Sequence, residues 1–103
     1  MAHEAADFDT TLAAAAGEDL ALLEELRAAF VESLTQQVDL LRRARCDGNW
    51  EVAALRIKGL GTSFHAPALV KLAQDALDGA PGEPAVIRKL ASLCERFAAR
   101  RPD

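Results

Sequence analysis

The sequence predicts an all-α protein: an antiparallel four-helix bundle with an additional short N-terminal helix. Its composition favours helices, since half of the residues are hydrophobic, alanine is abundant, tyrosine is absent and β-branched residues are few. Apolar residues recur at steps of three and four, the spacing of an amphipathic helix. Glycine, asparagine and proline positions divide the chain into five segments. A chain of 103 residues has the size of one domain, so we assign residues 1–103 to a single domain with disordered ends at residues 1–6 and 100–103.

The first two segments predict a short helix followed by a long one. The short helix is expected around Phe8 to Ala16, with Asp7 or Asp9 as its N-cap. The long helix opens after Gly17 and runs to about Arg45. Its apolar residues fall on one face: Leu23, Leu26, Phe30, Leu34, Val38 and Leu41.

Three further helices follow on short connections. The third is expected to begin at a cap at Asn49 and to run through Phe64. The fourth and fifth are expected to begin at Pro67 and Pro84, because proline suits the first position of a helix. Their apolar stripes predict one buried face each: Leu69, Val70, Leu72, Ala73, Ala76 and Leu77 in the fourth, and Ile87, Leu90, Leu93, Cys94 and Phe97 in the fifth.

Charge and composition exclude several classes of function. A net charge of -4 gives no overall attraction to nucleic acid or to an anionic membrane. No apolar run approaches the roughly 18 residues of a membrane helix, and the N-terminus lacks the pattern of a secretory signal. Two cysteines are too few for a disulfide scaffold and suit a reducing compartment. We therefore expect a cytoplasmic protein that binds neither nucleic acid nor membranes.

Metal and cofactor sites are not expected. The cysteines and histidines are spaced unlike any common metal-ligand motif: Cys46, Cys94, His3 and His65. Cys94 lies in the apolar stripe of the last helix and is expected to be a core residue.

The third helix has an unusual outer face. On a helical wheel its core side carries Ala53, Ile57, Leu60 and Phe64. Its opposite side carries Leu55, Gly59 and Thr62, with Lys58 flanking them and Arg56 nearer the boundary. A glycine within a helix costs up to about 1 kcal/mol relative to alanine, but it lets another molecule approach the backbone. A single surface leucine is ordinary, and the glycines can equally serve tight helix packing. The combination favours a contact surface.

The same stretch resembles the histidine-containing phosphotransfer (HPt) domains of bacterial phosphorelays. Their signature is His-x-(Leu/Ile)-Lys-Gly, five variable residues, Gly-Ala, and a leucine three residues later. Here the chain reads Leu55-Arg56-Ile57-Lys58-Gly59, then Leu60 to Phe64, then His65-Ala66, with Leu69 in register. The motifs Phe8-Asp9, Gly17-Glu18-Asp19 and Asp47-Gly48-Asn49-Trp50 also resemble the family, so the similarity spans about residues 7 to 97.

Three positions depart from the family pattern. Leu55 occupies the place of the phosphorylated histidine, Trp50 lies about one helical turn closer to it than expected, and His65 replaces the glycine that ends the helix. A phosphoacceptor needs a nucleophilic imidazole nitrogen, and leucine has no nucleophile or titratable proton. The resemblance therefore implies a surface that docks receiver domains without the residue that carries phosphate.

We expect a degenerate, non-enzymatic and monomeric HPt-like domain whose partner is a response-regulator receiver domain or a histidine kinase. Its docking surface would be Leu55, Arg56, Lys58, Gly59 and Thr62. Two alternatives remain open at this point. One is an active phosphotransfer protein that uses another acceptor such as His65, and the other is a helical scaffold outside two-component signalling.

Overall fold

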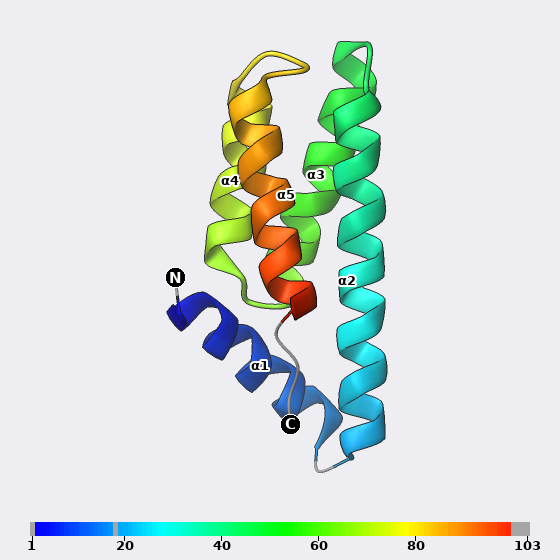
Figure 1. Ribbon diagram of the computed structural model, residues 1–103, viewed down its shortest axis with the longest axis vertical. Coiled ribbons are helices and arrows are strands. Elements are labelled where there is room, and N and C mark those ends of the chain that lie inside the picture. The colour runs from blue at the N-terminus through cyan, green and yellow to red at the C-terminus, as the bar shows by residue number, and fades with distance from the viewer. Residues whose placement is uncertain (1, 18, 100–103) are drawn as a thin grey trace.

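The computed structural model describes the backbone of residues 2–17 and 19–99 and the side chains of residues 9–17 and 19–99. It contains five helices, and the described residues form no strand (Figure 1). The prediction of an all-α protein is therefore confirmed. The helices are α1 (Ala2–Ala16), α2 (Leu20–Arg43), α3 (Asp47–Ser63), α4 (Pro67–Asp78) and α5 (Pro84–Ala99).

Helix α1 is longer than predicted. It begins at Ala2 and has 15 residues, whereas a short helix from about Phe8 was expected. No glycine or proline interrupts residues 2–8, so nothing in this stretch stops a helix. Residues 2–6, for which disorder was expected, belong to α1, while residues 1 and 100–103 lie outside the described residues.

The other helix boundaries agree with the sequence within two residues. Gly17 adopts a positive φ of 66° in the turn before α2, and Asp19 caps α2 by accepting a 3.1 Å hydrogen bond from the backbone N–H of Leu22. Helix α3 begins two residues before Asn49, because the sulfur of Cys46 serves as its N-cap. Helices α4 and α5 begin at their prolines, as predicted.

Helices α2 to α5 supply most of the core, and Leu12 of α1 is also buried in it. Helix α2 packs against α3 and α5, and α4 packs against the same two helices, whereas α1 packs against α2 and slants across the lower end of the view (Figure 1). The ring of Phe30 lies edge-on to those of Phe64 and Phe97, at centroid distances of 4.9 and 5.2 Å. These contacts join α2, the end of α3 and α5 around one core.

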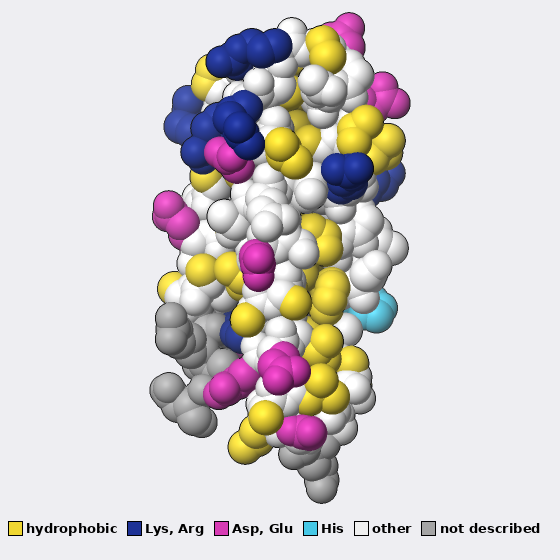
Figure 2. Space-filling model, turned by 90° about the vertical axis from the view of Figure 1, so that its right-hand side faces the viewer, with side chains coloured by type: hydrophobic (Ala, Val, Ile, Leu, Met, Phe, Trp, Pro, Cys, Tyr) yellow, Lys and Arg dark blue, Asp and Glu magenta, His cyan; other side chains and the backbone are white. Residues whose placement is uncertain are grey.

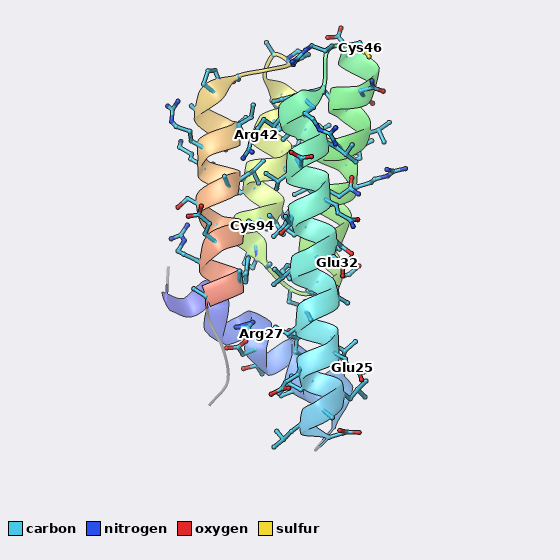
Figure 3. All side chains as sticks on the ribbon, turned by 45° about the vertical axis from the view of Figure 1, so that its right-hand side comes forward. Glu25, Arg27, Glu32, Arg42, Cys46 and Cys94 are labelled. Atoms are coloured by element: carbon cyan, nitrogen blue, oxygen red, sulfur yellow. The ribbon has the colours of Figure 1, made fainter. Side chains whose placement is uncertain are left out.

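Two polar interactions connect helices within this apolar packing. The indole Nε1–H of buried Trp50 donates a 2.7 Å hydrogen bond to the carbonyl oxygen of Ala76, which joins the start of α3 to the end of α4. Arg27 is buried on α2 (labelled in Figure 3), and its Nη1 lies 3.4 Å from Oδ1 of Asp9 on α1. Asp9 therefore holds α1 against α2 and does not cap α1.

None of the described helices is both long enough and apolar enough to cross a membrane.

Candidate functional site

Leu55 lies on the outer face of α3, with 49% of its surface exposed. The opposite side of the helix is buried and includes Ala53 and Ile57, as predicted. It also includes Trp50, Ala54 and Gly61, while Leu60 and Phe64 are only partly buried. The buried face is wider than the expected stripe because α3 packs against both α2 and α4. Leu55 nevertheless lies on the outer face of α3, as the helical wheel predicts.

Gly59 and Gly61 lie in different surroundings on α3. A Cβ built on Gly61 would lie 2.8 Å from Cγ2 and 3.0 Å from the backbone N of Val70 on α4, so no side chain fits there. A Cβ built on Gly59 would meet nothing within 4 Å. Tight helix packing therefore accounts for Gly61 and leaves Gly59 unexplained. Gly59 leaves the backbone of α3 open to an approaching molecule beside Leu55.

Lys58 lies at the edge of this face that adjoins α4. Its Nζ donates a 2.8 Å hydrogen bond to Oε1 of Gln74, whose Nε2 donates a 3.0 Å bond to Oδ1 of Asp78. These hydrogen bonds direct the ammonium group of Lys58 toward α4. Thr62 is exposed, and its hydroxyl donates a 2.9 Å hydrogen bond to the carbonyl oxygen of Lys58, one turn earlier in the helix.

Arg56 lies at the opposite edge, where α3 meets α2. It lines two neighbouring open hollows of about 330 and 340 Å³. Both hollows also include Gln37 of α2, and one of them reaches Gly59. The outer face of α3 therefore continues into a groove between α2 and α3.

Two exposed apolar residues extend this surface beyond the predicted set. Val52 is 47% exposed, Leu40 is 41% exposed, and both line the hollow of about 330 Å³. Val52 precedes Leu55 by three residues, so helical spacing alone could have placed it on the same face. Leu40 belongs to α2, and its position beside Val52 depends on how the two helices pack. We call Leu55, Arg56, Lys58, Gly59, Thr62, Val52 and Leu40 the α3 surface.

His65 lies away from this groove, just after the end of α3. Its backbone has a φ of 54°, and its Nδ1 lies 3.2 Å from the hydroxyl oxygen of Thr11 on α1. It lines another open hollow, of about 550 Å³, together with Thr11, Val70 and Thr62. The structure therefore does not bring His65 into the groove beside Arg56. His3, the other histidine, has its side chain outside the described residues.

The two cysteines lie in separate parts of the fold (labelled in Figure 3). Cys94 is buried, as predicted, and its sulfur lies 3.3 Å from the hydroxyl oxygen of Thr35 on α2. Cys46 is exposed at the start of α3. Within the described part of the chain, no three His, Cys, Asp or Glu side chains gather where they could hold a metal ion.

Comparison of the chain with protein-family models, curated proteins and solved structures gave no match.

Proposed function

We propose that this chain is a degenerate HPt domain that binds a receiver domain or a histidine kinase in the cytoplasm. It would modulate a two-component phosphorelay without carrying phosphate. The observation that supports this most is Leu55, which is half exposed at the position where the resemblance places a phosphorylated histidine. Since leucine has no nucleophilic atom, the proposal assigns no catalytic residue, no enzyme activity and no cofactor to the chain.

The proposal includes the fold of the family, in which α2 to α5 form an antiparallel four-helix bundle. The closed ring of packing supports it, because α2 and α4 each pack against both α3 and α5. The short connections also support it: residues 44–46, 64–66 and 79–83 separate successive helices, and short connections favour antiparallel neighbours.

Five residues of the α3 surface have distinct roles in the proposed contact. Leu55 and Val52 supply apolar area, and Gly59 lets the partner approach the helix backbone. Lys58 and Arg56 place positive charge at the two edges of the α3 surface, and this charge is complementary to an acidic pocket of a receiver domain. Gln74 keeps the ammonium of Lys58 in position for this contact.

Receiver binding tests the surface directly. We expect Leu55→Arg and Gly59→Leu each to weaken receiver binding roughly tenfold or more, because both fall in the centre of the contact. A Cβ at position 59 would meet nothing within 4 Å, and circular dichroism checks that Gly59→Leu remains folded. Ser92→Arg, at an exposed position on α5, is the matched control. Variants that bind receivers as well as the parent would show that the proposed surface is wrong.

Phosphorylation tests the absence of an acceptor. We expect no acid-labile label on the protein after incubation with an active histidine kinase, its receiver and labelled ATP. Label that appears and is lost in His65→Ala would replace the proposal with phosphotransfer through His65. Leu55→His then asks whether the remaining residues of the surface still support phosphoryl transfer once an imidazole is restored.

A further inference from the structure

Four apolar residues and Ser33 form a partly exposed stripe along the edge of α2 next to α3. On a helical wheel its members fall within a sector of about 60°: Leu22, Leu26, Ala29, Ser33 and Leu40. Leu22 is 38% and Leu40 41% exposed, Ala29 is exposed, and Leu26 and Ser33 are partly buried. We call these five residues the α2 stripe. Helix α2 has 24 residues, so the stripe extends over most of the length of the molecule.

The charges beside the α2 stripe differ between its two ends. Glu25 lies next to Leu22 at the start of the helix, and Arg43 lies next to Leu40 at its end. Both side chains are exposed. On the wheel, Glu25 and Arg43 lie on the same side of the stripe, and Arg43 also lines the hollow that Leu40 shares with Val52 and Arg56 of α3. In Figure 2, hydrophobic side chains follow the length of this face and Lys and Arg gather toward its upper end, whereas Asp and Glu side chains are spread from its upper to its lower end.

We propose that two copies of this chain associate through the α2 stripe, with their α2 helices antiparallel and Ser33 of each copy at the two-fold axis. An antiparallel pair places the acidic end of one stripe against the basic end of the other, so the stripe is complementary to itself. A second copy therefore fits this surface by both its apolar character and its charge. This symmetry is that of an isologous dimer.

A two-fold axis at Ser33 determines which residues of the two copies face each other. Residue n of one copy lies opposite residue 66−n of the other, which places Leu26 opposite Leu40 of the second copy. Leu22 then faces the hollow lined by Leu40, Ala44 and Val52 of the second copy. Glu25 falls within two residues of Arg43 of the second copy, about 3 Å along the helix axis. The small side chain of Ser33 lets the two helices approach where they cross.

The dimer replaces the expectation of a monomer, and it does not depend on the proposed signalling function. Its test is the mass of the purified protein, which involves no receiver and no kinase. Light scattering and sedimentation equilibrium over a hundredfold range of protein concentration are expected to show a concentration-dependent rise from the 11.0 kDa monomer to twice that mass. A monomer throughout this range would overturn the proposal.

Leucine substitutions locate the contact. Leu40→Glu is expected to raise the dissociation constant of the dimer roughly tenfold or more, because it places a carboxylate against the apolar stripe of the second copy. Leu20→Glu is the matched control: Leu20 is 73% exposed on the same helix but lies about 160° around it from Leu22. Equal weakening by the two variants would overturn the α2 stripe as the contact, and circular dichroism verifies that both remain helical.

Charge reversal tests the antiparallel register. Glu25→Arg and Arg43→Glu are each expected to raise the dissociation constant several-fold, because each places like charges opposite one another. The double variant restores opposite charges and is expected to return the constant to within about twofold of the parent. Both positions are exposed; Arg43→Glu also breaks the exposed pair with Asp39, which is expected to cost at most about 0.5 kcal/mol of folding stability. A double variant as weak as the single ones would overturn the register.

Discussion

Gly61 and Val70 are in such close contact that helices α3 and α4 leave no room for a side chain between them. A Cβ on Gly61 would lie 2.8 Å from Cγ2 of Val70 and 3.0 Å from its backbone N, and 3.2 Å from the carbonyl oxygen of Ala66. Two of these three neighbours are backbone atoms, which cannot move aside without shifting α4. The approach of α4 to α3 therefore depends on glycine at this position.

The two glycines of α3 are expected to respond in opposite directions to the same substitution. Gly61→Ala is expected to lower the free energy of unfolding by about 2 kcal/mol, because the added methyl group overpacks the contact with Val70. Gly59→Ala is expected to raise it by about 0.5–1 kcal/mol, because alanine favours the helix and meets no neighbour. Urea unfolding followed by circular dichroism measures both. A loss of stability in Gly59→Ala would contradict the open environment of that residue.

Sequence periodicity was sufficient to place the face of α3 but not to describe the groove beside it. The spacing of Leu55, Gly59 and Thr62 put them on the outer side, and the structure has all three exposed. The groove needs Leu40 next to Val52, and these residues belong to different helices. Their proximity depends on how α2 and α3 pack against each other, and the spacing of apolar residues within either helix does not predict that packing.

Some helix starts could be predicted from local sequence signals, and the start of α1 could not. Pro67 and Pro84 marked the starts of α4 and α5, because proline at the first helical position is a strong local signal. The start of α1 was missed because Asp7 and Asp9 resembled caps, whereas Asp9 instead pairs with Arg27. The role of that carboxylate depends on a residue 18 positions away in the sequence, which a local pattern does not reveal.

His65 lies in a backbone conformation that glycine adopts more easily. Its φ of 54° is left-handed, and the turn is closed by the N–H of Ala66 bonded to the carbonyl oxygen of Gly61 at 2.8 Å. His65→Gly is therefore expected to raise the free energy of unfolding by about 0.5–1 kcal/mol. His65→Ala keeps the strain and loses the contact with Thr11, so we expect it to be no more stable than the parent. Equal stabilisation by both variants would show that backbone strain is not the cause.

The contact between Asp9 and Arg27 is expected to hold α1 in place. Asp9→Ala removes the carboxylate that lies 3.4 Å from the buried guanidinium group, and we expect it to lower the free energy of unfolding by about 1–2 kcal/mol. The matched control is Asp39→Ala, which breaks the exposed pair with Arg43 at 2.9 Å on α2. Since exposed pairs contribute little, the expected loss there is at most about 0.5 kcal/mol. Thermal unfolding of both variants under the same conditions checks the difference.

Cys46 is a weak N-cap for α3, and the substitution Cys46→Ser is expected to make the protein more stable to unfolding. The residue has the extended backbone of an N-cap, and its sulfur accepts from the N–H of Asn49 at 3.5 Å. A hydroxyl oxygen accepts a shorter and stronger hydrogen bond, so Cys46→Ser is expected to raise the free energy of unfolding by about 0.5–1 kcal/mol. Cys46 is exposed, so the change leaves no cavity. Cys46→Ala removes the acceptor altogether and is expected to be less stable than the serine variant in urea unfolding. If the two variants unfold at the same urea concentration, the cap at position 46 contributes nothing to the start of α3.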